Sequence, residues 1–354
     1  MSTEPWTQLQ DRAEHLETDA GFSGVVRVTR GDQVLLESCL GLADRAHGTP
    51  VHVGTRFGTA SLSKAFTAVA VLDAVGRGEV GLQDRVVDVL PASARPSTLS
   101  PEVTVHHLLT HTAGLADYAE EDEDLPGFVE DYATIWTELP SYRVRDDLAI
   151  LPLFADLPPV CPPGTAFHYS NAGYVLLGIL LAHVSGLPFA EAVTTRVLEP
   201  AGMTSSGYLP LDEAHPDVAT GHLRPLTPDG PWRTNIFSIP AVGGGDGGAF
   251  VTVGDVERFL RGVHRGGVWR GVGPTDLLTP RVPVDEDSSA GYGVLVRDDG
   301  VFGKAGGDPG VCAIARCRPA TDTTLVLLGN VGWEDVEGLG DLVEALDAAA
   351  FPTV

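Results

Sequence analysis

The chain has 354 residues, of which 43% are hydrophobic and 20% are charged, so it is long and apolar enough to bury its own core. A formal net charge of −25 argues against nucleic acid and anionic membrane surfaces as partners, because both would repel it. We expect a globular protein of two or three domains or one two-lobed unit, with homo-oligomerisation left open.

Residues 1–20 are polar and acidic and lack the apolar segment of a secretion signal. The longest apolar stretch, residues 172–184, is too short to cross a bilayer. The sequence therefore predicts a cytoplasmic protein that does not insert into membranes. Four cysteines without CxxC spacing are expected to be free buried thiols rather than disulfide or metal ligands: Cys39, Cys161, Cys312 and Cys317.

The two ends of the chain carry the strand patterns. Residues 5–18 predict an amphipathic helix. Residues 24–30 and 33–38 flank a Gly-Asp turn and predict a β-hairpin. The C-terminal part predicts three strands and then a helix, at residues 291–297, 311–316, 323–328 and 334–350.

The middle of the chain, from about residue 84 to 265, is mostly helical with long loops. Four helices are expected there: residues 105–110 capped by Thr104, residues 172–185 capped by Asn171, a helix opened by Pro188, and residues 254–263. The acidic run 116–131 predicts a solvated face, and a lid over a cleft is the alternative. This order favours an α/β lobe made of residues 1–58 and 290–354, with a mainly helical lobe, 59–289, inserted between them.

One predicted helix start carries two reactive groups. Ser61 and Lys64 lie three residues apart where polar residues give way to an apolar run, so their side chains share a face. A serine beside a potential base is a candidate nucleophile. Of the 23 basic residues only Lys64 and Lys304 are lysines, and lysine, unlike arginine, can lose its proton when desolvated. A capping serine with a solvated lysine one turn on is the alternative.

Two further segments fit a serine mechanism. Tyr169 and Asn171 precede a helix, and in an extended turn their side chains point the same way. Tyrosine packing with an asparagine cap is the alternative. Lys304 stands in the glycine-rich segment 303–310 beside a strand, where backbone amides can approach a ligand closely.

Other catalytic patterns are missing from the sequence, which has no GxSxG, no HExxH and no phosphate-binding loop. The glycine run 243–248 formally matches GxGxxG, but no βαβ unit surrounds it, so we reject dinucleotide binding. His111 is expected to be structural. The sequence therefore predicts no cofactor and no metal.

Three motifs occur in one order: Ser61-x-x-Lys64, Tyr169-x-Asn171 and Lys304-x-Gly306. They resemble the motifs of the serine β-lactamase and penicillin-binding-protein superfamily. Segments 108–115, 201–207 and 247–250 resemble its class C-like branch, which includes family VIII carboxylesterases, D-aminopeptidases and related acyltransferases. The likeness covers residues 22 to about 330. It implies an α/β plus all-α fold, with an antiparallel sheet flanked by the terminal helices, an inserted helical lobe and an active site between the lobes.

The resemblance also implies roles for single residues. Ser61 would attack a carbonyl to form an acyl-enzyme, while Lys64 and Tyr169 would share the proton transfers as a coupled pair. A nearby ammonium is expected to lower the pKa of the phenol, and burial that of the lysine. The oxyanion hole would use the backbone N–H groups of Ser61 and Gly307. Four residues would bind substrate: Asn171, Lys304, Gly306 and Gly307.

The third motif departs from the family pattern. Ala305 stands where threonine is usual, which removes a hydroxyl that helps Lys304 bind a substrate carboxylate. Asp308 would repel an anionic substrate if it faces the cleft. These features favour a serine hydrolase that cleaves a small-molecule ester or amide, like a carboxylesterase. The alternatives are a β-lactamase or D-amino-acid peptidase, an acyltransferase using the same acyl-enzyme, and a catalytically silent binding module.

Overall fold

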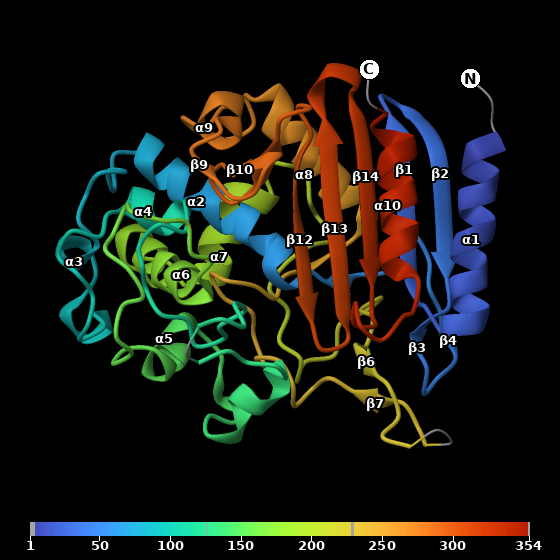
Figure 1. The fold of residues 1–354 in the computed structure, drawn as a ribbon, viewed down its shortest axis with the longest axis horizontal. Coiled ribbons are helices and arrows are strands. Elements are labelled where there is room, and N and C mark those ends of the chain that lie inside the picture. Colours follow the sequence, from blue (N-terminus) through green and yellow to red (C-terminus); the bar gives the residue numbers. More distant parts are fainter. Residues whose placement is uncertain (1–3, 126, 228–229, 353–354) are drawn as a thin grey trace.

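An eight-stranded sheet stands at the centre of the computed structural model, which describes residues 4–125, 127–227 and 230–352 (Figure 1). Every pair of neighbouring strands in this sheet is antiparallel. The strands follow the order β2 (Gln33–Leu40), β1 (Gly24–Arg30), β14 (Thr323–Gly329), β13 (Val311–Arg318), β12 (Phe302–Asp308), β11 (Leu295–Arg297), β10 (Ser288–Ala290) and β9 (Val282–Pro283). The two ends of the chain therefore meet in one sheet.

Helices cover both faces of the sheet. The described residues form α1 (Glu4–Ala20), α2 (Lys64–Gly76), α3 (Val86–Val89), α4 (Val105–Leu109), α5 (Asp147–Ile150), α6 (Asn171–Ser185), α7 (Phe189–Val193), α8 (Val253–Arg265), α9 (Pro274–Leu278) and α10 (Leu339–Ala350). Figure 1 shows α10 in front of the sheet near β14 and β1, α1 beside β2 at the right, and α2 to α7 gathered on the left. Short pairs join β3 (Leu42–Asp44) to β4 (Thr49–Pro50), β5 (Phe57–Gly58) to β8 (Phe250–Val251), and β6 (His222–Leu223) to β7 (Arg233–Thr234).

Side chains of the central strands alternate between two hydrophobic cores, as the two-residue period of a strand requires. On β13, Cys312 packs into the core shared with α1 and α10, whereas Cys317 packs into the larger core on the helical side. The two cysteines thus lie on opposite faces of the sheet. Among the described cysteines all four are free, but Cys39 is exposed and Cys161 half-buried, so the prediction of buried thiols holds for two of them.

The predicted α/β architecture, with an antiparallel sheet flanked by the terminal helices, is confirmed. Two boundaries are wrong. The predicted strand 291–297 is a turn followed by β11, because Gly293 has φ +73° and reverses the chain. The last helix begins at Leu339, after Gly338 at φ +82°. The division into lobes 1–58 with 290–354 and 59–289 stays a prediction.

Helix α6 begins one residue earlier than expected. Ser170 is its N-cap, and the Ser170 hydroxyl accepts a hydrogen bond from Gly173 N at 3.0 Å. Asn171 is therefore the first helical residue and not the cap, which leaves its side chain free for another contact. In the described part of the chain no single helix is long and apolar enough to cross a membrane; α6 with the segment Phe189–Leu198 meets that test only as a pair bent by 78°.

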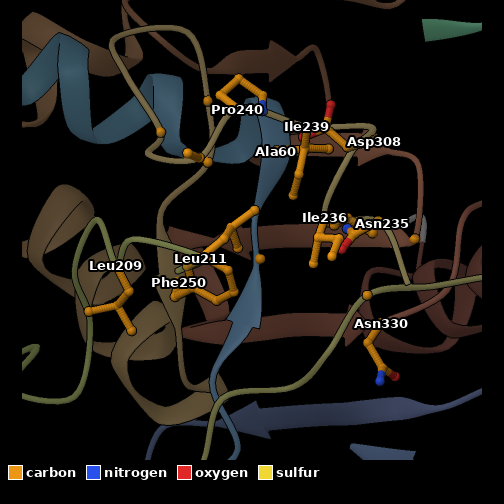
Figure 2. Close-up of a pocket in the computed structure, with 18 of the residues that line it drawn as sticks. Ala60, Leu209, Leu211, Asn235, Ile236, Ile239, Pro240, Phe250, Asp308 and Asn330 are labelled. Carbon is orange, nitrogen blue, oxygen red and sulfur yellow. The ribbon is translucent and has the colours of Figure 1, made fainter. Parts of the chain in front are cut away.

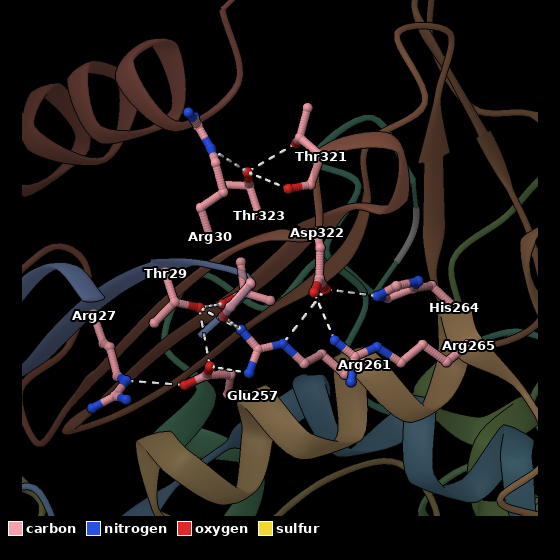
Figure 3. A network of polar contacts seen from close by, with 12 residues as sticks. Arg27, Thr29, Arg30, Glu257, Arg261, His264, Arg265, Thr321, Asp322 and Thr323 are labelled. Carbon is pink, nitrogen blue, oxygen red and sulfur yellow. Dashed lines mark hydrogen bonds and ion pairs between the residues drawn. The ribbon is translucent and has the colours of Figure 1, made fainter. Parts of the chain in front are cut away.

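A network of ion pairs ties α8 to the sheet on its helical side (Figure 3). The buried Glu257 carboxylate accepts hydrogen bonds from Arg27 Nε at 2.9 Å and Thr29 Oγ1 at 3.0 Å. It also pairs with Arg261 Nη1 at 2.5 Å. Asp322, before β14, pairs with His264 and Arg265 at the end of the same helix. The network thus joins β1, α8 and the turn before β14.

Replacing Glu257 by glutamine should lower the free energy of unfolding by about 1–3 kcal/mol, because two partly buried guanidinium groups each lose one of two carboxylate partners; Arg27 keeps Glu37 and Arg261 keeps Asp322. Urea unfolding monitored by circular dichroism measures this. Asp88→Asn is the matched control, since Asp88 and its partner Arg85 have side chains 57% exposed and should contribute less than about 1 kcal/mol. Equal losses in the two variants would contradict the structural role of the network.

Candidate active site

Ser61 lies in a tight turn, η1 (Ala60–Ser63), that leads into α2. The turn begins at Ala60 with φ +45°, a conformation that residues with a Cβ rarely adopt and that often marks a functional site. The expected polar caps are not found, because Thr59 Oγ1 donates to the carbonyl of Ala249 at 2.8 Å and caps no helical amide. The neighbouring segment before β8 thus holds the turn in place.

Lys64 is fully buried, and three oxygen atoms surround its amine. Lys64 Nζ lies 2.8 Å from Ser61 Oγ, 2.6 Å from Asn171 Oδ1 and 2.6 Å from the backbone oxygen of Asp246. The alternative of a solvated lysine is therefore excluded by its burial. The three-residue spacing places the amine directly against the serine hydroxyl.

Tyr169 is the second group beside the serine. Tyr169 and Ser61 border the same cavity, and the Tyr169 ring centroid lies 5.1 Å from Lys64 Nζ and 4.6 Å from Lys304 Nζ. His111, expected to be structural, is buried and accepts a hydrogen bond from Ser170 N at 3.1 Å. Because the His111 ring lies 4.6 Å from that of Tyr169, it also supports the phenol.

Strand β12 brings the third motif to the serine. The segment 303–310 was expected beside a strand, but its residues up to Asp308 form the strand itself. Pairing with β11 ends at Gly303, so residues 304–308 leave one edge without a neighbouring strand among the described residues. Figure 1 shows β12 on the side of the sheet that meets the helices. This edge packs against the turn that carries Ser61.

Gly306 has no room for a side chain. A Cβ there would stand 2.1 Å from Thr59 O, 2.9 Å from Ser61 N and 2.8 Å from Leu62 N. Trp333 also holds the backbone of Gly306 in position, because its indole Nε1 donates a hydrogen bond to Gly306 O at 2.8 Å. Glycine therefore permits the close approach of β12 to the turn that carries the serine.

Replacing Gly306 by alanine should lower kcat/KM by about 10²-fold or more, because β12 must move away from the Ser61 amide. Steady-state ester hydrolysis measures this loss. Gly340→Ala in α10 is the control: nothing lies within 4 Å of its Cβ, so activity should be unchanged and stability equal or higher by up to about 1 kcal/mol. Full activity of the Gly306→Ala variant would show that β12 does not take part in catalysis.

Burial dominates the electrostatics of the site. It lowers the pKa of Lys64 below the usual lysine value, although the carboxylates of Asp246 and Glu121 act in the opposite direction. Burial, helped by the charge of Lys64, lowers the pKa of Lys304 to about 7. The expected lowering of the Tyr169 pKa is wrong, because burial and the charge of Glu121 raise it well above its usual value. Tyr169 is therefore a neutral phenol at neutral pH.

The acidic run 116–131 contains functional residues that the sequence analysis missed. Asp117 and Glu120 are only 5% and 3% exposed, so a solvated face describes only the later part of the run, where residues 121–124, 127–128 and 130–131 are exposed. The Asp117 carboxylate accepts hydrogen bonds from the backbone N–H groups of Asn171 and Ala172 at the start of α6. Burial raises the pKa of Asp117 to about 7. Asp117 thus positions Asn171, which in turn holds Lys64.

The glycine run 243–248, rejected as a dinucleotide site, forms one wall of the candidate active site. Asp246 accepts from Lys64 through its backbone oxygen and from the Tyr118 hydroxyl through its carboxylate. Gly245 has no space for a Cβ, which would stand 2.2 Å from Tyr174 O. The sequence signal for this wall was an aspartate within a glycine run, because glycines allow the backbone to approach a buried group such as the Lys64 amine.

Two cavities meet at Ser61, and Glu121 and Gly307 also border both. The first, of about 290 Å³, is lined by Asn171, Asp308 and apolar residues of segments 209–219 and 236–250 (Figure 2). The second, of about 420 Å³, is lined by Tyr169, Lys304 and Trp333. We call them the Asn171 cavity and the Tyr169 cavity. The structure thus brings together all the candidate site residues, and within the part of the chain it describes it contains no cluster of His, Cys, Asp or Glu suited to a metal ion.

Comparison with known proteins shows the family of the chain. The family model described as Beta-lactamase matches residues 9–350. The chain belongs to the β-lactamase family. A solved penicillin-binding protein from Bacillus halodurans is similar to this β-lactamase-family protein with a TM-score of 0.84 and 35% identity, over 94% of this chain and 98% of that one.

Two curated relatives of the chain carry different names, one a penicillin-binding protein and the other an esterase. Penicillin-binding protein 4 of Amycolatopsis lactamdurans is 29% identical over 71% of this chain and 62% of its own length. Esterase EstB of Burkholderia gladioli is 37% identical over 52% of this chain and 46% of its own length. The chain therefore spans less than two thirds of the length of these curated relatives.

Proposed function

We propose that this protein is a serine hydrolase that cleaves a small-molecule ester or amide through an acyl-Ser61 intermediate. The observation that carries the proposal is the contact of 2.8 Å between Ser61 Oγ and the amine of the fully buried Lys64. A buried amine with a lowered pKa can take the hydroxyl proton as the oxygen attacks a carbonyl.

The surroundings of Lys64 favour the neutral amine as the general base. Two of its three partners, Asn171 Oδ1 and the Asp246 carbonyl, can only accept hydrogen bonds, so they hold the two N–H groups of a neutral amine. The remaining lone pair then faces Ser61, whose hydroxyl can donate to it. In this role Lys64 receives the proton of the nucleophile.

Tyr169 fits the role of the acid that protonates the leaving group. Its raised pKa keeps the phenol protonated, and it borders only the Tyr169 cavity. The leaving group should therefore depart into the Tyr169 cavity, and the acyl group should lie in the Asn171 cavity. Tyr169 can recover a proton from the Lys64 ammonium nearby. Water then attacks the acyl-Ser61 ester, the proton transfers run in the opposite direction, and the acid is released with Ser61 restored.

We assign the oxyanion hole to the backbone N–H groups of Ser61 and Gly307. Ser61 stands at the start of a helical turn, where the first amides lack intrahelical partners and the helix dipole favours negative charge. Gly307 lies on the part of β12 that extends past β11, and it borders both cavities. Two donors at these positions would stabilise the charge that develops on the carbonyl oxygen.

Carboxylesterase-like activity is favoured by two features of the third motif, Ala305 in place of a hydroxyl and Asp308 on the Asn171 cavity. The similarity to an esterase supports the same choice. β-Lactamase or D-amino-acid peptidase activity is the second candidate, because Lys304 borders the Tyr169 cavity and could pair with a substrate carboxylate. An acyltransferase would use the same acyl-enzyme with another acceptor.

Rapid mixing of the protein with excess p-nitrophenyl butyrate tests the proposal. We expect a burst of about one p-nitrophenol per chain if release of the acyl group is the slower step, and a fluorophosphonate should abolish turnover. Parallel assays with nitrocefin and D-alanine p-nitroanilide distinguish β-lactamase or D-amino-acid peptidase activity from esterase activity. Turnover of either compound with no turnover of any ester would replace the esterase assignment, and no turnover of all three would contradict the hydrolase.

A further inference from the structure

Asp147, the first residue of α5, carries a buried carboxyl that the acylation chemistry does not use. The residue is only 3% exposed. Its Oδ1 accepts a hydrogen bond from Gly245 N at 2.8 Å, whereas its Oδ2 has no hydrogen-bond partner among the described residues. Burying a carboxyl without full hydrogen bonding costs free energy, so such groups gather where a function requires them. The bond to Gly245 leads directly to the active site.

Two glycines let the backbone approach this carboxyl from two sides. A Cβ on Gly178 of α6 would stand 2.1 Å from Asp147 Oδ2, and a Cβ on Gly244 would stand 2.3 Å from Oδ1. Neither position has room for a side chain larger than hydrogen. The carboxyl is thus enclosed between α6 and the glycine run 243–248, so a change in the carboxyl is transmitted to that run.

The same glycine run contacts α2 through its carbonyl groups. Gly245 O accepts a hydrogen bond from Thr67 Oγ1 at 2.7 Å, and Asp246 O accepts one from Lys64 Nζ at 2.6 Å. Glycines give a backbone many alternative conformations, so the run needs outside contacts to keep one of them. The bond from Gly245 N to Asp147 is such a contact, and it lies one residue before the carbonyl that binds the amine.

A second buried carboxyl acts on the other oxygen that holds Lys64. That oxygen is Asn171 Oδ1, and Asp117 accepts a hydrogen bond from the backbone N–H of Asn171. The two oxygens that can only accept from the amine therefore both lie in segments whose backbone N–H groups are bound by a buried acid. When both are fixed, the remaining direction of the amine points to Ser61.

Asp147 can bind the glycine run without a negative charge. Burial raises the pKa of Asp147 well above its usual value, and the charges of Asp246 and Asp146 act in the same direction. A neutral carboxyl still has an oxygen that accepts from Gly245 N. An uncharged amide of the same shape should therefore be able to replace it.

We propose that Asp147 is a positioning residue that holds the glycine run so that the Asp246 carbonyl binds the Lys64 amine and directs its lone pair at Ser61. Asp147 is not among the described residues that line either cavity, so it acts through Lys64 and not on the substrate. The inference rests on the proposed hydrolase function. It goes beyond that function because it assigns the orientation of the base to a residue outside the three sequence motifs.

The test compares Asp147→Asn with Asp147→Leu in the hydrolysis of p-nitrophenyl butyrate. Both side chains have nearly the shape of aspartate, but only asparagine can accept the hydrogen bond from Gly245 N. We expect Asp147→Asn to stay within about 3-fold of the wild-type kcat. In Asp147→Leu kcat should fall by about 10- to 100-fold while KM stays within a few-fold, because the base is misplaced and no binding contact is lost.

The pH profile separates positioning from a general loss of structure. A carbonyl oxygen stabilises the ammonium form of Lys64 more than the neutral amine, so losing the Asp246 contact lowers the pKa of Lys64. The fall of kcat/KM on the acid side should therefore lie at lower pH in Asp147→Leu than in the wild type. In Asp147→Asn it should stay at the wild-type pH.

Asp146→Ala is the matched control. The exposed Asp146 is the N-cap of α5, and its Oδ1 accepts a hydrogen bond from Ala149 N at 3.0 Å. This variant weakens the same helix without removing a contact to the glycine run. Its midpoint of urea unfolding should fall, while kcat and the pH profile stay those of the wild type.

The outcomes separate this inference from the hydrolase function. An unchanged kcat and pH profile in Asp147→Leu, or a loss in Asp147→Asn as large as that in Asp147→Leu, would overturn the inference while ester hydrolysis by the wild type stands. If Asp147→Leu does not fold, Asp147→Ala makes the same comparison, and the result for Asp147→Asn still decides. No ester turnover by the wild type, together with an unlabelled Ser61, would overturn both.

Discussion

Replacing Ser61 by alanine should lower kcat/KM for p-nitrophenyl esters by roughly 10³-fold or more and remove the burst. The reason is that no other hydroxyl lies against the Lys64 amine among the contacts of the described site. Variants of nucleophiles in other enzymes lose activity on this scale. Stopped-flow and steady-state assays measure both effects.

The matched control for the serine variant is Ser63→Ala in the same turn. The Ser63 hydroxyl donates to Ala60 O at 2.9 Å and has no contact with Lys64. This variant should remain within about 10-fold of wild type, since it loses one hydrogen bond of about 1 kcal/mol. Ester turnover by Ser61→Ala at more than a tenth of the wild-type rate would mean that the nucleophile has been misassigned.

Replacing Lys64 by methionine should lower kcat by roughly 10³-fold while leaving KM for a neutral ester within a few-fold. The amine contacts the nucleophile and the groups that hold it, so its loss removes the general base rather than a binding contact. Two buried acceptors also lose a donor, so the protein should be less stable by about 2 kcal/mol or more. Steady-state kinetics and urea unfolding separate the two effects.

The pH profile of the wild type provides an independent check on the same residue. The base acts only when it is deprotonated, so kcat/KM should be high above the pKa of Lys64 and fall as the pH drops through it. Because burial lowers that pKa, the fall should lie below the usual lysine value of about 10.4. Full activity of Lys64→Met would contradict the role of a neutral lysine. So would a kcat/KM that, as the pH is lowered, has already fallen to half its maximum above pH 10.

Ser61 and Lys64 of the candidate site could be placed together from the sequence because their signal is local. Ser61 and Lys64 need only one helical turn to meet, and the sequence contains just one other lysine. The strand character of β12 was missed because Lys304, Ala305 and two glycines have little preference for strands. That segment is a strand because β13, which follows it directly after a tight turn, pairs with it along its whole length, and this hairpin outweighs the weak strand preference of its residues.

The buried acids could not be predicted for a different reason. A run that contains Asp117, Glu120 and Glu121 looks solvated, since carboxylates are seldom buried. The Asp117 carboxylate is buried because the backbone amides at the start of α6 bind it, and those amides lie more than fifty residues further along the chain. The cap of α6 was misplaced by one residue because serine and asparagine are both good N-caps.

Peptide mapping of the protein after reaction with a fluorophosphonate tests the central claim most directly. We predict one adduct per chain, located on the peptide that contains Ser61, and a labelling rate that falls steeply in Lys64→Met. A protein that hydrolyses esters while its adduct lies on another residue, or that forms no adduct at all, would contradict the account.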